Sequence, residues 1–575
     1  MASLRRLSLL TALGVLLGAA GGFAAWLLVH LIGIITNLAL FGRWGTDIPS
    51  FADYQPTAWL FVAAAAGGLV VAAIALWAPV IRGHGIPEAM EAILVRQSRI
   101  APRVAVAKPL SAAVAIGTGG PFGAEGPIIV TGGSMGSLIG QILPLTPAER
   151  KILLASGAAA GMAATFGAPL AAVVLAVELL LFELSARALL PLIAASSVAA
   201  AMHLWLFGTG PIFHVPLHDF SGLGQLPLFA VLGLACGLLA VVICRGLFLV
   251  EAVFERLPIP SFWHPVLGAL GFALVGVFEP LVLGVGYGVI NDALAGKLAA
   301  GTLAVLVVAK LLAWWVALGS GTSGGTLAPV LLISSCFGAL CANGVEAVWP
   351  GLGVSVSAVA VVAMAATFGA ATRASFTAIV FAFELTRDYR AIVPLMMATV
   401  IADLVARALL PHDLMTEKLA RRGLSVPRLY EPDHLRVTRV ATVMTRDVEV
   451  VDADDTVDVV LARFESVGHS AFPVMTDERL AGIVSRADLM GAPDGAHPVR
   501  DVASHDVVTI GAGDTVLTAL HAIVDEGVDH LPVVDDDDRL VGIVTRTDIM
   551  RARADAARAD VHDGHRLRVR RNGTS

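Results

Sequence analysis

The sequence has few charged residues: Lys, Arg, Asp and Glu make up 15% of its 575 residues, against roughly 25% in soluble globular domains. The shortage is confined to one part of the chain. Residues 1–410 hold 19 Lys or Arg and 17 Asp or Glu, and subtraction from the totals of 39 and 46 leaves 20 and 29 for residues 411–575. Charged residues are thus roughly 9% of the first part and 30% of the second, which predicts a membrane-embedded part followed by a water-soluble one.

Cysteine is also scarce. The four cysteines, Cys236, Cys244, Cys336 and Cys341, lie in apolar stretches and lack the short spacing of metal ligands. We therefore expect buried apolar side chains and no metal site. A His-Glu-x-x-His motif is absent as well, so a membrane enzyme that used Glu125 as its acid lacks support, and we expect no enzymatic activity.

The N-terminus lacks the short apolar core of a signal peptide. Arg5 and Arg6 precede an apolar run from Leu7 to about Leu40, which is too long for such a core. We expect a retained membrane helix whose amino end is cytoplasmic, because Lys and Arg favour that side. Several of the later apolar segments are shorter than the ~20 residues that span a bilayer, and glycine and proline interrupt many of them. Such segments are typical of transporters with broken helices.

One carboxylate stands in the segment around which the rest of the chain is organised. Residues 119–136 read GGPFGAEGPIIVTGGSMG, and Glu125 is their one ionisable residue. An ionisable group at membrane depth is costly and is therefore a functional candidate. Gly126 lets the backbone approach a ligand, and Pro127 suits the first turn of a helix. We expect a helix N-terminus here, and such N-termini bind anions.

The spacing of Gly123 and Pro127 occurs twice more, in Gly83-His84-Gly85-Ile86-Pro87 and in Gly325-Thr326-Leu327-Ala328-Pro329. Three broken helix starts in one apolar chain predict three N-termini that face a shared ion site. One helix N-terminus contributes only about 0.3–2 kcal/mol to anion binding. Several converging amides are therefore needed to replace the hydration shell of a halide.

Two internal duplications divide the chain. The heptapeptide Met-Ala-Ala-Thr-Phe-Gly-Ala occurs at 162–168 and again at 364–370, and each copy leads into an apolar helix that ends near a glutamate, Glu178 or Glu384. In the soluble part, Gly482 to Asp488 matches Gly542 to Asp548. Each of these phrases follows an alternating strand and a helical stretch, which predicts two α/β repeats.

These phrases resemble those of a known family. GHGIP, GAEGP and GTLAP are similar to the GSGIP, GREGP and GxFxP signatures of the CLC chloride channels and chloride/proton exchangers. The resemblance covers about the first 425 residues, and the tail resembles the paired CBS modules that many CLC proteins carry. It implies a polytopic α-helical membrane protein with broken helices and an inverted repeat, followed by a cytoplasmic α/β CBS pair.

The resemblance also implies an organisation. We expect a CLC-type transmembrane anion-transport domain at 1–425, a linker at 426–439, CBS domains at 440–491 and 499–552, and a basic C-terminal tail at 553–575. The expected protein is a homodimer with one path per subunit. It lies in the plasma (inner) membrane with its N-terminus and CBS domains in the cytoplasm, and its partners are chloride, protons and membrane lipid, without nucleic acid.

Site roles follow from the same resemblance. Glu125 matches the gating glutamate, whose carboxylate can occupy an anion site until protonation lets it swing away. The anion-binding positions implied by the three phrases and the segment before the cytoplasmic exit are His84, Gly85, Gly126, Gly325, Thr326, Leu327 and Met415. In the CBS pair, the implied ligand is an adenine nucleotide (ATP, ADP or AMP), and no other cofactor is expected. The positions that would bind this nucleotide are Ser485, Asp488, Thr545 and Asp548.

Four positions depart from the family pattern. His84 replaces the anion-contacting serine, Ala124 an arginine, and Met415 the pore tyrosine. Leu179 stands where many exchangers carry their inner proton acceptor. Two groups remain open as proton relays: His84, because imidazole titrates near neutrality, and Glu183, because it lies one helical turn beyond Leu179.

The predicted function is transmembrane chloride transport through a glutamate-gated path, as a chloride/proton antiporter or a voltage- or pH-gated channel, regulated by the CBS domains. The alternatives are a passive chloride channel without proton coupling and a transporter of another anion such as fluoride. A third alternative, from a different class, is a nucleotide-sensing membrane protein with a vestigial pore.

Overall fold

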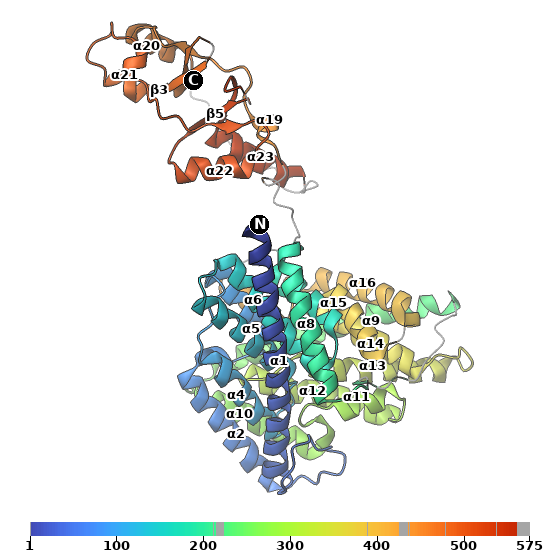
Figure 1. Cartoon of the computed structure of the whole chain (residues 1–575). Helices are drawn as coiled ribbons and strands as arrows, with labels where there is room; N and C mark the ends of the chain where they lie inside the picture. The colour runs from blue at the N-terminus through green and yellow to red at the C-terminus, as the bar shows by residue number, and fades with distance from the viewer. Residues whose placement is uncertain are drawn as a thin grey trace. The chain divides into compact units, whose positions relative to one another are not determined.

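The computed structural model describes residues 2–559, apart from 211, 214, 216–222, 388, 425–434, 436, 437, 478 and 536. The chain forms two compact units, Met1–Leu429 and Tyr430–Ser575, and each is treated by itself (Figure 1). Most of the expected linker, and residues 560–575 of the expected basic tail, lie outside the described residues.

The first unit is helical. Its helices are α1 (Ala2–Leu40), α2 (Ala58–Trp77), α3 (Ile86–Val95), α4 (Val104–Gly117), α5 (Glu125–Ile142), α6 (Pro147–Phe166), α7 (Pro169–Ala176), α8 (Ala186–Leu206), α9 (Leu226–Arg256), α10 (His264–Phe278), α11 (Tyr287–Leu294), α12 (Ala300–Gly319), α13 (Leu327–Val348), α14 (Val356–Thr372), α15 (Ser375–Thr386), α16 (Ile392–Leu409) and α17 (Glu417–Arg421). Seven helices of the described residues are long and apolar enough to cross a membrane. By contrast, α7 and α11 have eight residues each. The expectation of broken, short helices is confirmed.

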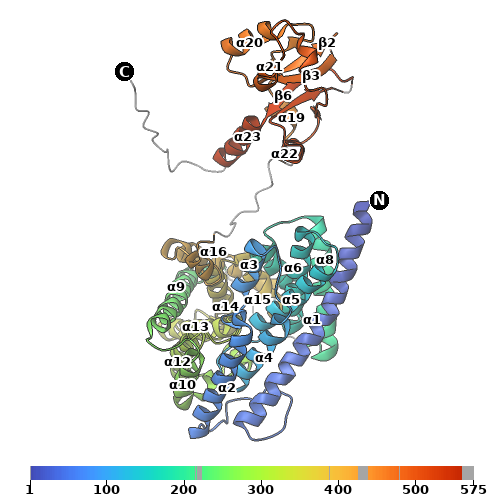
Figure 2. The same cartoon turned by 90° about the vertical axis from the view of Figure 1, so that its left-hand side faces the viewer.

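The two halves of this unit repeat one packing pattern. In the first half α1 packs against α6 and α8, and α5 packs against α6. In the second half α9 packs against α14 and α16, and α13 packs against α14. Figure 2 places the helices of each set next to one another. The duplicated heptapeptide lies at the end of α6 and within α14, so the sequence repeat is also a structural repeat.

The repeat is inverted, as reciprocal helix caps show. Glu384, near the end of α15, accepts hydrogen bonds from the amides of Leu170 (2.9 Å) and Ala171 (2.7 Å) at the start of α7. Glu178, just after α7, accepts from the amide (3.0 Å) and the hydroxyl (2.5 Å) of Thr377 at the start of α15. Each helix therefore begins where the other ends, so the two helices run antiparallel. A carboxylate at a helix N-terminus satisfies amides that lack a partner within the helix.

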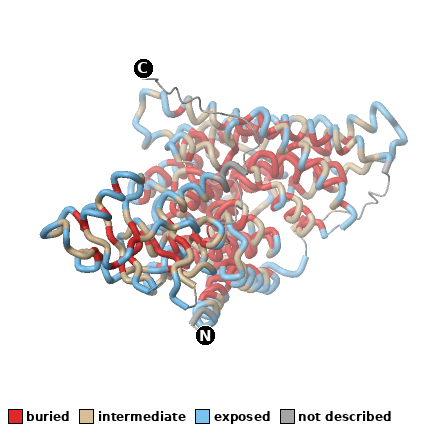
Figure 3. Tube along the Cα trace, turned by 90° about the horizontal axis from the view of Figure 1, so that it is seen from above, coloured by how far each residue is buried: buried red, intermediate tan, exposed pale blue. Residues whose placement is uncertain are grey.

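Buried residues lie in the interior of the helical unit, and exposed residues lie along its periphery (Figure 3). The core is rich in alanine and glycine, which lets helices approach closely in a membrane. Cys236, Cys244 and Cys336 are buried and Cys341 is partly buried, which confirms the expectation of apolar packing.

The second unit contains two similar α/β repeats. In the first, β1 (Val451–Asp452) pairs parallel with β2 (Ala471–Thr476), and β2 pairs antiparallel with β3 (Arg479–Ser485). In the second, β4 (Ile510–Gly511) and β5 (His530–Val534) pair in parallel, and β5 pairs antiparallel with β6 (Leu540–Thr545). The helices of this unit are α19 (Val440–Val443), α20 (Val457–Ser466), α21 (Arg486–Met490), α22 (Val516–Asp525) and α23 (Arg546–Ala559).

The packing of these repeats crosses the expected domain boundaries. The segment around α19 joins the second repeat: the Val440 amide donates to Asp514 O (2.9 Å), and Thr445 bridges to Ile543. The segment before β4 joins the first repeat, where Ser504 bridges to Ile483. The stretch that precedes the first repeat in sequence thus packs into the second repeat, and the stretch that precedes the second repeat packs into the first.

Helix α23 extends into the stretch expected as the basic C-terminal tail, 553–575. Helix α23 continues to Ala559. Its stretch from Arg551 onward is rich in alanine and arginine, residues with high intrinsic helix propensity, which is why the helix of the second repeat extends past the predicted boundary.

Candidate functional site

The three glycine–proline phrases meet at one place. Backbone hydrogen bonds join Gly123 N to Gly325 O (3.4 Å) and Gly325 N to Gly123 O (3.0 Å). Gly83 bridges to Ser323 beside this pair. The predicted helix starts are confirmed, because α3 begins within the first phrase, α5 within the second and α13 within the third.

Glycine is required where the phrases touch. A Cβ atom on Gly126 would lie 2.1 Å from His84 O and 3.2 Å from the Cα of Gly325. A Cβ on Gly85 would lie 2.8 Å from Gly126 O. Side chains larger than hydrogen would separate the backbones, so these glycines allow the approach of three helix starts.

Glu125 is the first residue of α5 and is fully buried. Its Oε1 accepts a hydrogen bond from the hydroxyl of Tyr287, and its Oε2 has no hydrogen-bond partner among the described residues. Oε2 lies against the Gly123–Gly325 pair, since a Cβ on Gly123 would be 1.7 Å from it and one on Gly325 3.2 Å. The carboxylate thus occupies the junction between the N-termini of α5 and α13.

Two other groups act electrostatically on this carboxylate: the backbone of Ala328, in the first turn of α13, and the ammonium group of Lys310 in α12. Lys310 is fully buried, and its Nζ donates to Val282 O (2.8 Å) and Gly284 O (3.0 Å). The junction therefore combines helix N-termini with a nearby buried cation, an environment that favours an anion.

Lys108 repeats the arrangement of Lys310 in the first half. It is fully buried, and its Nζ donates to Ile81 O and Gly83 O, both at 2.7 Å. Each lysine thus fixes the loop that leads into a short helix, α3 or α11. A buried ammonium is tolerated because carbonyl oxygens replace its water.

Sequence reasoning missed Tyr287. A signal was available in the repeat, because Pro280, Gly284, Gly286 and Tyr287 follow the spacing of the Pro79-to-Ile86 stretch that leads into α3. Helix α11 starts at Tyr287 after Gly286, whose φ of 85° lies in the left-handed region. The second half therefore contributes a fourth helix start, one without the proline that marks the other three.

His84 is buried, and its Nδ1 has no hydrogen-bond partner among the described residues. Three charged groups surround the ring and act on it: Glu88, Lys418 and Lys108. The backbone of Leu414 acts on it as well. Leu414 precedes Met415, so the structure brings together two positions that depart from the family pattern.

The remaining predicted anion-binding positions differ in whether their backbone amides already have a hydrogen-bond acceptor. The Gly85 amide donates to Glu88 Oε2 (2.8 Å), so it is already engaged. The Met415 amide donates to Asp413 Oδ1 (2.8 Å). Thr326 caps α13 and Leu327 begins it, and both are buried next to the Gly123–Gly325 pair. Amides at a helix start lack partners within the helix, so the start of α13 is the best-placed donor.

Glu183 does not lie on the helical face of Leu179, so this prediction is wrong. The helical turns after α7 end at Leu181, and Phe182 adopts a left-handed conformation with φ of 53°. A change of backbone direction therefore separates the two residues. Leu179 is buried, whereas Glu183 is exposed and accepts a hydrogen bond from the Ser185 hydroxyl (3.3 Å).

A basic cavity of about 570 Å³ opens between α3, the loop before α4 and α17. Its charged lining consists of six cations and two acids: Arg82, Arg96, Arg99, Arg103, Lys418, Arg422, Glu88 and Glu91. Glu88 pairs with Lys418 (3.3 Å), and Glu91 pairs with Arg96 (2.8 Å) and Arg422. The cations outnumber the acids by four, which makes this cavity attractive to anions.

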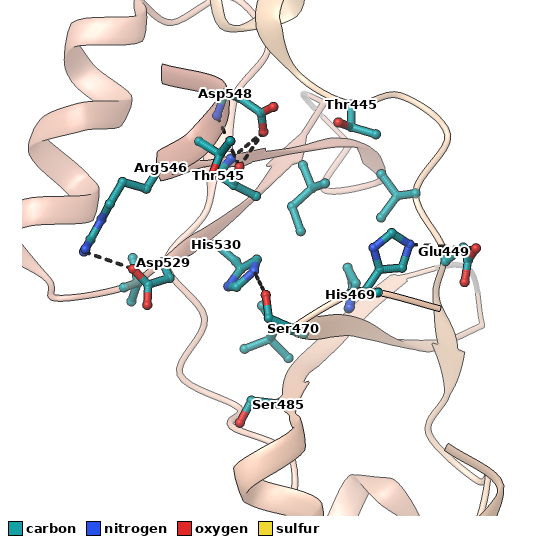
Figure 4. Close-up of a pocket in the computed structure, with 18 of the residues that line it drawn as sticks. Thr445, Glu449, His469, Ser470, Ser485, Asp529, His530, Thr545, Arg546 and Asp548 are labelled. Atoms are coloured by element: carbon teal, nitrogen blue, oxygen red, sulfur yellow. Dashed lines mark hydrogen bonds and ion pairs between the residues drawn. The ribbon is translucent and has the colours of Figure 1, made fainter. Parts of the chain in front are cut away.

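In the second unit, a cleft of about 970 Å³ lies between the two repeats, and all four predicted nucleotide positions line it. Figure 4 shows Ser485 at one end, Thr545 and Asp548 at the other, and His530 with Ser470 between them. His530 Nε2 and Ser470 Oγ lie 2.8 Å apart. Burial lowers the pKa of His530, although Asp529 acts in the opposite direction.

Each predicted pair in this cleft forms a helix cap. Asp488 Oδ2 accepts from the amide (2.8 Å) and the hydroxyl (2.7 Å) of Ser485. Asp548 Oδ2 accepts from the amide (3.0 Å) and the hydroxyl (2.7 Å) of Thr545. The duplicated motif is therefore explained in part by capping. Capping leaves Asp488 Oδ1 for other contacts, whereas Asp548 Oδ1 already accepts from Arg551 (3.5 Å).

Sequence reasoning passed over two Gly-x-Ser-x-Gly patterns. One, at residues 321–325, lies in the loop before α13, where the Ser111 hydroxyl donates to the buried Ser323 hydroxyl (2.9 Å) and helix α12, rather than a strand, leads into the turn. The other is at residues 132–136. It lies inside α5, where the buried Ser134 hydroxyl donates to Val130 O (2.7 Å). The nucleophile elbow of hydrolases needs a strand–turn–helix instead, so neither pattern gives support to an enzyme.

Two family models match the chain. The model described as voltage gated chloride channel matches residues 62–407, and the CBS domain model matches residues 440–495 and 499–555. The H(+)/Cl(-) exchange transporter ClcA of Vibrio campbellii is 31% identical over 369 residues, which cover 62% of this chain and 78% of that relative. Chloride channel protein CLC-f of Arabidopsis thaliana is 30% identical over 499 residues, which cover 81% of this chain and 60% of that relative.

Among solved structures, a slow cyanobacterial Cl-/H+ antiporter superposes with a TM-score of 0.64 at 28% identity. The superposition covers 73% of this chain and 98% of that chain. The helical arrangement described above is thus similar to that of a known transport protein.

The contact between the phrases leads to a prediction about two glycines of α5. Gly126→Ala should prevent the phrases from meeting and weaken chloride binding at least about tenfold, because its Cβ would lie 2.1 Å from His84 O. Gly133→Ala is the matched control, since the nearest atom to its Cβ would be 3.5 Å away. Calorimetric titration of the purified protein with chloride measures both, and equal affinities in the two variants would contradict the steric argument.

Proposed function

Because the chain belongs to the voltage-gated chloride channel (CLC) family, whose members move anions across membranes, we propose that it is a chloride/proton exchanger gated by Glu125. It is a multi-pass membrane protein that transports anions and carries tandem CBS domains. We further propose that it acts as a homodimer in which each subunit contains one path.

The observation that carries the proposal is the position of the Glu125 carboxylate. It lies at the junction of two helix N-termini, with one oxygen on Tyr287 and the other against the backbone of Gly123 and Gly325. Such a place suits any small anion, and the carboxylate is an anion on a short tether. A proton neutralises the carboxylate, removes its attraction to the amides and lets chloride replace it.

The anion path follows from the amides at the same junction. The starts of α13, at Thr326 and Leu327, and of α5, around Gly126, supply backbone donors without a full positive charge. Binding by neutral donors stays weak enough for the ion to leave, which conduction requires. The basic cavity lined by Lys418 and the arginines around it would raise the local anion concentration.

Two observations bear on proton coupling. The names of the similar ClcA proteins and of the cyanobacterial structure describe exchange of chloride and protons. The buried Leu179 favours a second candidate, a passive chloride channel, because it offers no proton acceptor on the inner side. His84 remains the proposed relay for exchange, since its Nδ1 is buried without a partner among the described residues and Glu183 lies outside the helix.

We predict that a chloride gradient drives uphill proton movement into liposomes that contain the wild-type protein. Glu125→Gln should abolish that movement and leave chloride flux independent of pH, because the amide mimics the protonated acid. In the same assay His84→Ser should retain chloride flux with reduced proton movement. Glu346→Gln, at an exposed acid near the end of α13, is the matched control. Chloride flux without proton movement in the wild type would establish the channel, and pH-dependent flux in Glu125→Gln would remove the gating role.

We propose that the protein lies in the plasma (inner) membrane. The face that contains Arg6, Arg187 and Arg422 would then lie in the cytoplasm. On this face Arg6 pairs with Glu149 (2.7 Å), which also pairs with Arg187 (2.8 Å). Arg422, shortly before the chain leaves the membrane unit, pairs with Glu91 in the basic cavity. Clusters of Lys and Arg favour the cytoplasmic side and contact anionic lipid.

The orientation can be measured by cysteine labelling in intact cells. Ala52→Cys lies in the exposed loop after α1, and Ala101→Cys lies in the exposed loop before α4. In a Cys341→Ser background, a membrane-impermeant maleimide should label the first site and not the second. Labelling of Ala101→Cys alone would reverse the proposed orientation.

For the CBS pair we propose regulation by an adenine nucleotide bound in the cleft. Five acids line the cleft, Asp447, Glu449, Asp488, Asp529 and Asp548, against two arginines. Both arginines are already paired: Arg546 with Asp529 (2.9 Å) and Arg551 with Asp548 (3.5 Å). A surplus of negative charge repels a polyphosphate, so the lining favours AMP over ADP and ATP.

We predict that the full-length protein in detergent binds AMP more tightly than ATP, as measured by calorimetry. Asp488→Ala and Asp548→Ala together should weaken AMP binding at least about tenfold, because the Oδ1 atoms of both carboxylates would accept the ribose hydroxyls, that of Asp548 in exchange for Arg551. Asp514→Ala is the matched control, since Asp514 holds the Gly511 amide (2.9 Å) outside the cleft lining. Undiminished affinity in the double variant, or tightest binding of ATP, would contradict the proposal.

A further inference from the structure

We propose that Tyr287 is an anion ligand of the gate position. Its hydroxyl holds the Glu125 carboxylate when that side chain occupies the site, and it donates to chloride when the carboxylate has left. This inference rests on the gating role proposed for Glu125 and adds a residue from the second half of the chain to the transport site.

The hydroxyl already contacts a carboxyl oxygen in the structure. It donates to Glu125 Oε1, and the carboxylate stands at the place where a chloride ion would bind. A donor that faces a carboxylate oxygen faces any anion that replaces this oxygen at the same place. A hydrogen bond to a charged acceptor changes a binding constant by about tenfold or more, which is large enough to matter for a weakly bound halide.

The ring is fixed from two sides. Phe166 lies edge-on to it with ring centroids 6.4 Å apart, and Phe213 lies edge-on at 6.1 Å. Phe166 belongs to the duplicated heptapeptide and also contacts Phe381 in α15 (4.8 Å). Because tyrosine has few rotatable bonds and its ring is packed, the hydroxyl can stay in place when its acceptor changes.

The chain lacks the two hydroxyls that usually reach the anion. His84 and Met415 stand at those positions, and the Met415 side chain has no O–H or N–H group to offer. Tyr287 supplies a hydroxyl from the opposite half, at the position that Ile86 holds in the first half. Tyr287, at the start of α11, therefore provides the hydroxyl that positions 84 and 415 lack.

The neighbouring charge cannot replace this donor. Lys310 directs its ammonium group to two backbone carbonyls, Val282 O and Gly284 O, so it acts on the site mainly through its field. The groups that act on Glu125 are Tyr287 from α11, Lys310 from α12, the Ala328 backbone from α13 and its own amide in α5. Among these, the tyrosine offers the one neutral side-chain donor.

The test removes one oxygen atom. Tyr287→Phe keeps the ring and deletes the hydroxyl, and Tyr54→Phe, at a buried tyrosine packed against Phe41 and Phe51, is the matched control. In a Glu125→Ala background, where no carboxylate competes, Tyr287→Phe should weaken calorimetric chloride binding about tenfold, which corresponds to the lower end of a charged hydrogen bond. Tyr54→Phe should leave the affinity unchanged.

A second measurement tests the hydrogen bond between the Tyr287 hydroxyl and the Glu125 carboxylate in protein that retains Glu125. The infrared band of the ionised Glu125 carboxylate, identified by its loss in Glu125→Gln, should shift in Tyr287→Phe and stay unchanged in Tyr54→Phe. An unchanged chloride affinity would show that the hydroxyl does not bind the anion, and an unchanged band would show that it does not hold the carboxylate. Either result overturns the inference. Absence of chloride binding in Glu125→Ala itself would instead reject the proposed transport site.

Discussion

The pairing of Gly123 with Gly325 is the contact on which the membrane unit depends. Helices that break inside a bilayer expose amides and carbonyls that no water can satisfy. Here the loops before α5 and α13 supply hydrogen-bond partners to each other, through two backbone hydrogen bonds between Gly123 and Gly325. Gly126, which has no side chain, lets the loop that contains His84 approach to contact distance. The helix starts that remain open then face one small volume. The proposed anion site is therefore a consequence of how the two halves satisfy their backbones, and the glycines are needed for this site as much as for the fold.

Buried charge follows the same rule of reciprocal satisfaction. Lys108 and Lys310 each direct their ammonium group to two carbonyls in a loop before a short helix. The partly buried Glu178 and Glu384 each cap the helix of the opposite half. Each of these charges replaces water with backbone groups, so none needs an opposite charge beside it. Glu125 is the exception, since Oε2 has no hydrogen-bond partner among the described residues. An incompletely satisfied carboxylate can leave its place at a lower cost than that of Glu384, whose two oxygens each accept a backbone amide.

The sequence predicted the parts of this design that are local. Glycine four residues before proline located three helix starts correctly, because both residues restrict the backbone at a helix N-terminus, and the heptapeptide repeat located the two halves. The inversion needed the caps of Glu178 and Glu384, since a repeat in sequence carries no direction in space. Tyr287 was missed because its helix start lacks the proline, and the argument for Glu183 failed because a left-handed residue at Phe182 ends the helix. The exchange of segments between the CBS repeats could not be predicted, because it pairs residues far apart in the chain and hydrophobic periodicity indicates only local structure.

Neutral donors explain how one site can serve two anions in turn. A carboxylate and a chloride ion differ in shape, so a bidentate arginine would fit the first and hold it too firmly. Amides at helix starts and a single phenolic hydroxyl impose little shape, and each contributes modestly. The balance between the tethered carboxylate and free chloride then depends on a proton and on chloride concentration, the two quantities that an exchanger must link. By the resemblance, Ala124 stands in place of an arginine and Met415 in place of the pore tyrosine. Under the proposed gating, a free anion therefore has fewer fixed contacts, whereas the carboxylate keeps its own hydrogen bond. In such a site the carboxylate should hold the position more of the time than in relatives that keep those side chains, which favours tight gating over fast flux.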